Sequence, residues 1–288
     1  MATSEYRASQ GACWWRFILL LFAAVLLSGC SRLFFLPEQG HRWDPATVGV
    51  NYEDVWFQAE DGTRLHGWFL PADEARGTIV FLHGNAENVS THIGAVHWLP
   101  QRGYNVFLPD YRGFGLSEGR PDFHGVHLDA RAALEYAAGR EDVADGPLVV
   151  LGHSLGGAVA ITSVARDGQA YGVRALIADS AFSSYRGIAR EKFAELWLTW
   201  LFQWPLSLAI SDRYAPLDHV ADVSPIPLLL ITGEDDRIVP PHHSEKLYSA
   251  ARPPVDLWQF PNIGHTQAFA LEAVREDFIS WVDKTLGY

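Results

Sequence analysis

The chain has 288 residues, of which 48% are hydrophobic and 19% are charged, a composition typical of a globular protein with a sizeable core. The formal net charge is −12, and the acidic residues are spread along the chain with no basic cluster. This pattern argues against a nucleic-acid-binding surface, and we expect no nucleic acid among the partners.

The amino terminus predicts export. Arg7 and Arg16 precede an uninterrupted apolar run at 17–27, which is followed by the small residues Ser28 and Gly29. A run of this length suits the core of a signal peptide, whereas a membrane-spanning helix needs roughly 20 apolar residues. We therefore interpret residues 1–29 as a signal peptide, with an uncleaved anchor or a buried helix as the alternative.

The end of this segment suggests a lipid anchor. The residues Leu26-Leu27-Ser28-Gly29-Cys30 resemble the lipobox of bacterial lipoproteins, which implies that Cys30 is lipidated and becomes the first residue of the mature chain. By the same analogy, Ser31 favours the periplasmic face of the outer membrane. We expect an exported, membrane-anchored protein in which residues 30–50 form a tether and residues 51–288 form one domain. Because the other cysteine is Cys13, that domain has no internal disulfide.

Alternating strands and helices follow the tether. A hairpin at 52–59 and 65–70, around the turn 60–63, opens the domain. Short apolar strands are expected next at 78–82, 105–108, 148–151, 175–178, 227–232 and 255–260. Helices are expected around 90–102, 122–138, 155–167 and 242–251, with a closing helix at 268–286. Apolar strands separated by helices predict an α/β fold, with a mostly parallel central sheet and helices on both faces.

A candidate nucleophile lies between one strand and one helix of this series. The pattern G-x-S-x-G at 152–156 places Ser154 at a sharp strand-to-helix turn, and its glycines let the two elements pass without a Cβ clash. A serine hydroxyl needs an imidazole to take its proton and a carboxylate to orient that imidazole. His265 follows the strand at 255–260, and Asp236 follows the strand at 227–232, with Asp235 as a rival for the acid.

Four stretches together resemble the α/β-hydrolase superfamily over nearly all of residues 50–288. They are Leu82-His83-Gly84-Asn85, residues 110–117, residues 152–157, and residues 233–240 with Gly264-His265. Within the superfamily, the chain is similar to a membrane-tethered subgroup related to eukaryotic protein depalmitoylases and bacterial serine-aminopeptidase-like hydrolases. The resemblance implies an α/β-hydrolase fold and the chain order serine, acid, histidine. It favours Asp236, the fourth residue of G-x-x-D-x-x-V-P, as the acid.

An oxyanion hole is expected from the backbone N–H groups of Asn85 and Leu155, the second of which follows the nucleophile at the helix start. The family's usual run His-Gly-Asn-Ala-Gly-Asn has Glu87 in place of its second glycine here, which leaves the path of that loop open. We interpret residues 110–117 as a supporting loop.

A long insertion at about 183–224 is expected to form a small helical cap. Within it, Trp197, Trp200 and Trp204 recur at helical spacing and define an apolar face, which makes them candidates for a substrate pocket or lid. Three interpretations stay open. The face packs on the core, lines a groove for an acyl chain, or meets a membrane, where tryptophan tolerates both an apolar and a wet side.

These residues predict a lipid-anchored serine hydrolase that cleaves carboxylic ester or thioester bonds of lipid-like acyl substrates through an acyl-enzyme on Ser154. A lysophospholipase or a serine aminopeptidase-like amidase is the alternative, because the same triad serves both. A hydrolase-fold module that binds a lipid or a protein is the non-enzymatic alternative. No cofactor is implied. No metal site is expected, because the pairs His124/His127 and His242/His243 lack the H-E-x-x-H pattern and a partnering cysteine.

Overall fold

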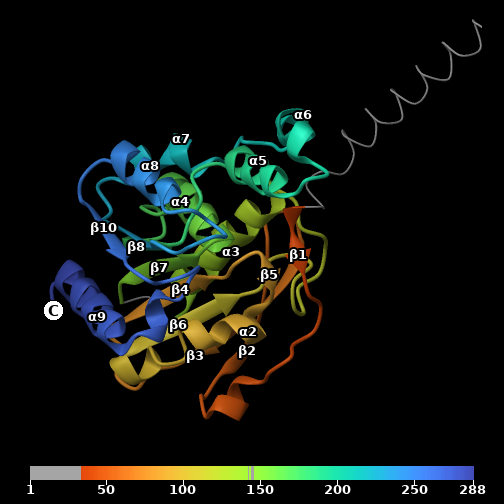
Figure 1. Cartoon of the computed structure of the whole chain (residues 1–288). Helices are drawn as coiled ribbons and strands as arrows, with labels where there is room; N and C mark the ends of the chain where they lie inside the picture. Colours follow the sequence, from red (N-terminus) through yellow and green to blue (C-terminus); the bar gives the residue numbers. More distant parts are fainter. Residues whose placement is uncertain (1–33, 142, 144–145) are drawn as a thin grey trace, which may run out of the picture.

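The computed structural model describes residues 34–141, 143 and 146–288 (Figure 1). The predicted signal peptide and the predicted lipidation site Cys30 lie outside the described residues. Across the described part of the chain, none of the helices combines the length and the hydropathy needed to cross a bilayer.

A central sheet of eight strands organises the chain, in the order β10-β9-β8-β7-β4-β6-β3-β2. The strands from β10 to β6 run parallel, and β3 pairs antiparallel with β6 and β2. The sheet strands are β2 (Glu53–Gln58), β3 (Arg64–Leu70), β4 (Gly77–Leu82), β6 (Tyr104–Pro109), β7 (Leu148–His153), β8 (Val173–Asp179), β9 (Leu228–Gly233) and β10 (Val255–Phe260). A separate parallel pairing joins β1 (Leu36–Pro37) to β5 (Ala86–Glu87). The expected α/β architecture is confirmed.

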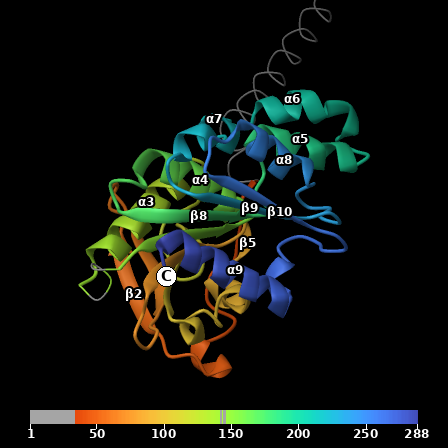
Figure 2. The same ribbon diagram turned by 90° about the vertical axis from the view of Figure 1, so that its left-hand side faces the viewer.

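Helices cover both faces of this sheet, as Figures 1 and 2 show. The α-helices are α2 (Val89–His92), α3 (Gly125–Gly139), α4 (Leu155–Asp167), α5 (Tyr185–Glu195), α6 (Gln203–Leu208), α7 (Pro216–His219), α8 (His242–Ala250) and α9 (Glu272–Leu286). The 3-10 helices are η1 (Pro45–Val48), η2 (Ile93–Ala95), η3 (Pro100–Arg102), η4 (Trp200–Phe202), η5 (Val220–Val223) and η6 (Ala268–Ala270). Within the insertion, α5, η4 and α6 pack together at one end of the sheet and form the cap, whereas α7 and η5 contact α4 (Figure 1).

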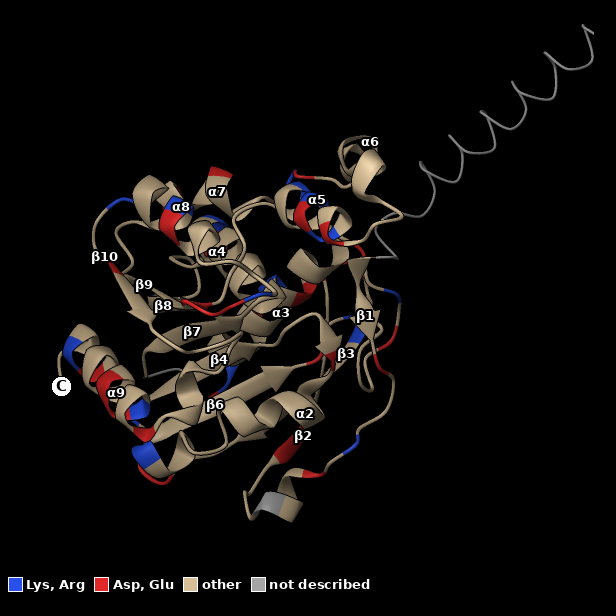
Figure 3. Ribbon diagram, viewed as in Figure 1, with Lys and Arg blue, Asp and Glu red and all other residues tan. Residues whose placement is uncertain are grey.

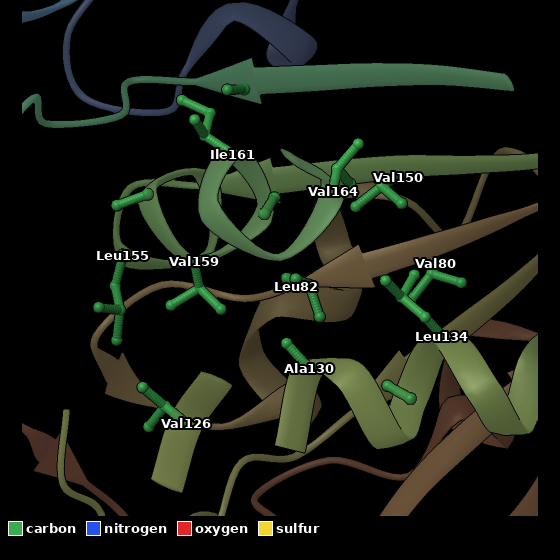
Figure 4. Packing of buried hydrophobic residues seen from close by; sticks show 14 of the residues in the cluster. Val80, Leu82, Val126, Ala130, Leu134, Val150, Leu155, Val159, Ile161 and Val164 are labelled. Carbon is green, nitrogen blue, oxygen red and sulfur yellow. The ribbon is translucent and has the colours of Figure 1, made fainter. Parts of the chain in front are cut away.

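Strand side chains alternate between two hydrophobic cores. Val80 and Leu82 of β4 pack against α3 and α4 in the first core (Figure 4), whereas Ile79 and Phe81 face the second core, which α9 covers. Burial on both faces explains why these strands are apolar throughout instead of alternating with polar residues. Each such side chain contributes about 1.5–3 kcal/mol when fully buried, so the central strands form a rigid base for the loops at their carboxyl ends.

Two expected helices differ from the structure. The segment 90–102 forms only short turns, α2, η2 and η3, because Gly94 favours no helix and Pro100 cannot donate a helical hydrogen bond. The closing helix begins at Glu272, after Leu271 adopts an extended backbone (φ −88°, ψ 124°) that separates α9 from η6.

The described part of the expected tether at 30–50 packs on the domain instead of forming a spacer. Phe35 is 2% exposed, and β1 pairs with β5 beside the expected oxyanion loop. We refer to Phe34–Pro37 as the amino-terminal strap.

Candidate active site

Ser154 lies at the turn between β7 and α4 with a strained backbone (φ +54°, ψ −112°). A Cβ added at Gly152 would lie 2.3 Å from the carbonyl oxygen of Gly156, and one added at Gly156 would lie 1.9 Å from that of Leu82. Both glycines are therefore required by close backbone contacts. The two close backbone contacts hold Ser154 at a positive φ, which residues other than glycine rarely adopt. Such strain is typical of functional sites.

His265 and Asp236 form a hydrogen-bonded pair. The Nδ1 atom of His265 lies 2.7 Å from Asp236 Oδ2, while Asp236 Oδ1 accepts from the backbone N–H groups of Ile238 (2.9 Å) and Val239 (2.8 Å). The carboxylate accepts hydrogen bonds on both oxygens, so its orientation toward the imidazole is fixed. A proton on Nδ1 leaves Nε2 of His265 free to accept another.

The neighbouring carboxylate of Asp235 is exposed and makes no hydrogen bond within the described residues, although its backbone N–H donates to Ile263. The structure thus brings Asp236, and not Asp235, to the histidine.

The loops of the serine and the histidine meet at the end of β8. The backbone N–H of Ser154 donates to the carbonyl of Asp179 (2.8 Å), and the N–H of Thr266 donates to Ser180 Oγ (3.1 Å). Within the described part of the chain, no hydrogen bond joins the Ser154 hydroxyl to the His265 ring. Such bonds are often long until substrate is bound.

In the described part of the chain, the two backbone donors expected to form the oxyanion hole are not used by other hydrogen bonds. Neither the N–H of Asn85 nor that of Leu155 donates to an acceptor in the described residues. Leu155 is the first residue of α4, where the helix dipole favours an anion. A Cβ added at Gly84, next to Asn85, would lie 3.8 Å from the Cβ of Ser154, so this loop passes beside the serine. The two amides are available to a ligand atom.

The amino-terminal strap holds the loop that carries Asn85. The carbonyl of Asn85 accepts from the N–H of Leu36 (3.2 Å), and the side-chain Nδ2 of Asn85 donates to the carbonyl of Phe34 (2.6 Å). Glu87 has φ +64°, so it adopts the left-handed backbone that glycine would supply at this position. The backbone of this loop therefore follows the path that the family's glycine would allow, even though Glu87 carries a side chain.

An apolar cavity of about 400 Å³ opens beside Ser154. Its lining combines residues of the strap, the start of the cap and the loop after β9, with the apolar side chains Phe34, Phe182, Ile188, Phe193, Ile210 and Val239 among them. Lys192 is a charged lining residue, and its ammonium group already donates to Glu195 Oε1 and to the carbonyl of Arg237. No carboxylate belongs to the described lining. The cavity suits an apolar chain more than a charged one.

The sequence pointed to Trp197, Trp200 and Trp204 as pocket or lid residues and gave the strap no role in the pocket. Phe193, which belongs to the same helically spaced apolar series as the tryptophans, does line the cavity. These tryptophans are 83%, 57% and 63% exposed and do not line the cavity. The interpretations as core packing and as groove wall were therefore wrong for these three side chains, and the interpretation as an outward apolar surface remains. The apolar triplet at 34–36 was the available signal for the strap, but it lay inside the predicted tether.

A second carboxyl group lies behind the serine. Burial raises the pKa of Asp179 to about 7 and lowers the pKa of His153 to about 3. Asp179 Oδ2 and His153 Nε2 lie 3.4 Å apart, and neither atom has another partner in the described residues. Between these two pKa values both side chains are uncharged, which suits their burial.

The loop at 110–117 has a supporting role, as expected. Arg112 makes ion pairs with Asp129 (2.8 Å) and Asp61 (2.7 Å), and Asp110 Oδ1 accepts from the N–H of Val89 (3.0 Å). These contacts tie the loop to α3, to the first hairpin and to the segment that follows Asn85.

Two groups of described side chains bring three possible metal ligands within 4.8 Å of one another. In the first, His243 Nδ1 accepts from the backbone N–H of Ser183, so its Nε2 carries the proton and donates to Glu191 (3.2 Å); His242 contacts the same carboxylate. The hydrogen-bonding of His243 leaves no lone pair for a metal.

The second group is His41, His66 and Asp110, in which His66 Nδ1 has no partner. These residues could hold a cation, but none of them lines the cavity beside Ser154. The pair His124 and His127 instead contacts Tyr214 and Tyr185.

Comparisons with known proteins agree with this geometry. Residues 73–216 match a family model described as serine aminopeptidase, S33. The chain is 43% identical over 243 residues to the uncharacterized protein YfhR of Escherichia coli K12, covering 82% of each chain. It is 33% identical over 266 residues to the alpha/beta hydrolase domain-containing protein WAV2 of Arabidopsis thaliana, covering 86% of this chain and 85% of that one.

Among solved structures, the esterase Pf2001 of Pyrococcus furiosus has a TM-score of 0.68 at 25% identity, covering 88% of this chain and 96% of that chain. The sheet is mostly parallel, with a serine at the turn after β7 and a histidine after β10. Together with these relatives, this arrangement shows that the chain belongs to the α/β-hydrolase superfamily and is a hydrolase.

Proposed function

We propose that this chain is a lipid-anchored serine hydrolase that cleaves carboxylic ester or thioester bonds of apolar acyl groups, through an acyl-enzyme on Ser154. The observation that carries the proposal is the apolar cavity beside a serine that shares its edge of the sheet with the His265–Asp236 pair. The resemblance of residues 26–30 to a lipobox supports the anchor.

In the proposed first step, His265 Nε2 takes the proton of the Ser154 hydroxyl while Oγ attacks the acyl carbon. The negative charge moves to the carbonyl oxygen, which the N–H groups of Asn85 and Leu155 stabilise. Asp236 holds the imidazole in the tautomer that can accept a proton and stabilises the imidazolium. The bond to the leaving oxygen or sulfur then breaks, and that atom takes the proton from His265.

In the second step, His265 removes a proton from a water molecule that attacks the acyl carbon. The carbon–oxygen bond to Ser154 breaks, the serine regains its proton from His265, and the carboxylic acid leaves.

An aminopeptidase activity is less well supported. A substrate with a free α-ammonium group needs a carboxylate to bind it, and the described lining of the cavity offers none. The apolar lining and the esterase among the structural relatives favour an uncharged acyl group instead.

A fluorophosphonate probe tests the proposal because it labels a serine that a neighbouring base activates as a nucleophile and leaves ordinary serines unlabelled. We expect labelling of the wild-type chain, no labelling of Ser154→Ala, and full labelling of Ser163→Ala. Ser163 is a matched control because it lies on the same helix, and its buried hydroxyl has no partner in the described residues. An unlabelled wild-type chain would contradict the proposal and favour a binding module.

A substrate panel then tests the acyl preference. Oxygen esters and thioesters of graded chain length are compared with aminoacyl amides, and we expect hydrolysis of the first two classes only. Preferred cleavage of the amides would contradict the assignment.

A further inference from the structure

The cap carries an apolar surface that nothing in the described chain covers. We define the cap patch as the large, exposed apolar side chains of η4, of α6 and of the segment just before η4. Each is 57% to 83% exposed: Leu196, Trp197, Leu198, Trp200, Leu201, Phe202, Trp204 and Leu208. A protein with a net charge of −12 has no Asp, Glu, Lys or Arg between 196 and 211. In Figure 3, α6 is free of charged residues, whereas the adjacent α5 carries both signs.

Such a surface is not needed for folding. The side chains of the cap patch face solvent, so they gain little from the core, and a contiguous apolar patch on a soluble protein usually marks a binding surface. The guanidinium group of Arg190 lies 4.4 Å above the ring of Trp204, which restrains one edge of the patch.

The cap patch continues into the wall of the cavity. Phe193, three residues before its first member, and Ile210, two residues after its last, both line the cavity that contains Ser154. Helix α5, which carries Phe193, lies beside α6 in Figures 1 and 2. An apolar chain entering the cavity from this side would therefore pass from one apolar surface to another.

The amino-terminal end of the described chain indicates what covers the patch. Phe34 lines the same cavity, and the apolar run at 17–27 ends seven residues before it. Because a fully extended chain spans at most about 3.5 Å per residue, Leu27 lies within roughly 25 Å of the cavity wall, and Cys30 within roughly 14 Å. Whether the anchor is the apolar run or a lipid on Cys30, the bilayer that holds it lies close to the cap.

We propose that the cap patch is a lipid-docking surface, which lies in the interfacial layer of the bilayer that holds the amino terminus and presents the cavity to lipid-embedded acyl groups. Tryptophan prefers this layer, and an uncharged patch with aromatic and leucine side chains matches an interfacial segment. This inference rests on the proposed function: the docking rests on the proposed anchor, and the entry of substrate from the bilayer rests on the proposed hydrolase activity.

Fluorescence quenching tests the docking without any activity. The full-length protein is reconstituted in vesicles of phosphatidylethanolamine and phosphatidylglycerol, with and without brominated acyl chains. We expect quenching in the wild-type chain that falls clearly in the combined variant Trp197→Phe, Trp200→Phe and Trp204→Phe. Trp43→Phe is the matched control because Trp43 is 61% exposed and precedes η1. The orange turn of η1 lies at the bottom of Figure 1, whereas α6 lies at the top. Equal quenching in the combined variant and the wild-type chain would overturn the proposal.

A kinetic comparison tests the delivery of substrate. The variant Trp197→Ser, Leu198→Ser and Leu201→Ser is compared with the wild-type chain on a water-soluble short-chain ester and on a long-chain ester embedded in the same vesicles. We expect a loss of at least roughly tenfold on the embedded ester only, since the variant removes apolar area that enters the bilayer. An equal loss on both substrates would assign the patch to folding, and no loss on either would overturn the proposal.

Two further outcomes separate the remaining explanations. A wild-type chain that hydrolyses neither ester but shows patch-dependent quenching would contradict the proposed function and leave the docking supported. A dimer in detergent-free solution that the triple serine variant abolishes, with no patch-dependent quenching, would assign the cap patch to a second copy of the chain.

Discussion

The substitution Asp236→Asn tests how the carboxylate orients His265. Asp236 Oδ1 accepts two backbone N–H groups at 2.9 and 2.8 Å, and Oδ2 lies 2.7 Å from His265 Nδ1. The side-chain oxygen of an asparagine would stay with the two backbone donors, which turns its NH₂ group toward the imidazole. The imidazole must then present a lone pair at Nδ1, so its proton moves to Nε2 and it can no longer take the proton of Ser154.

We expect this variant to lose about 10⁴-fold in kcat, equivalent to roughly 5.5 kcal/mol of transition-state stabilisation. The free energy of unfolding should change little because both backbone hydrogen bonds can persist. The assay is the hydrolysis of a p-nitrophenyl ester of a short acid, with urea denaturation as the folding control. Asp235→Asn is the matched control, and we expect it to stay within about twofold of the wild-type rate, since exposed surface substitutions rarely perturb a fold.

Two results would refute this reasoning. An Asp236→Asn enzyme within tenfold of the wild-type rate would show that the carboxylate does not set the tautomer. A larger loss in Asp235→Asn than in Asp236→Asn would assign the acid to the exposed neighbour.

Three further predictions concern the surroundings of the serine. Burial raises the pKa of Asp179 from 3.8 to about 7, so between these pH values the folded state keeps a proton that the unfolded state loses. The contribution of Asp179 to stability is therefore fully present below about pH 4 and is lost as the pH rises to about 7. Urea denaturation at pH 5 and pH 8 should therefore show Asp179→Asn gaining stability relative to the wild-type chain at the higher pH, by about 2.6 kcal/mol, since about two pKa units of the shift fall between these two pH values; a pH-independent difference would contradict the shift. Phe34→Ala should enlarge the cavity and shift the preference in an ester series toward bulkier acyl groups, whereas an unchanged series would remove the strap from the pocket wall. Gly156→Ala should abolish soluble expression because its Cβ would lie 1.9 Å from the carbonyl oxygen of Leu82, while Gly94→Ala, with open space around it, should express normally; normal expression of both would refute the close contact.

Local sterics made much of the fold and of the serine turn predictable. The interior strands β4, β6, β7, β8 and β9 are buried on both faces, so they are mostly apolar, and the sequence showed this directly. The two glycines around Ser154 predicted the serine turn because close backbone contacts leave no space for a Cβ at either position. The prediction of a helix at 90–102 was wrong because Gly94 and Pro100 limit this segment to short turns.

The sequence by itself determined the order of the strands and helices, the serine at its turn and the short set of candidates for acid and base, because each depends on periodicity or on backbone space. Only the tertiary structure decided between the two adjacent carboxylates, since neighbouring side chains point in different directions and the N–H groups of Ile238 and Val239 receive just one of them. It also decided that the strap lines the cavity and that the tryptophans of the cap face outward. The sequence shows that an apolar side chain is favoured away from water. It does not show which surface buries that side chain, because this depends on contacts between distant segments.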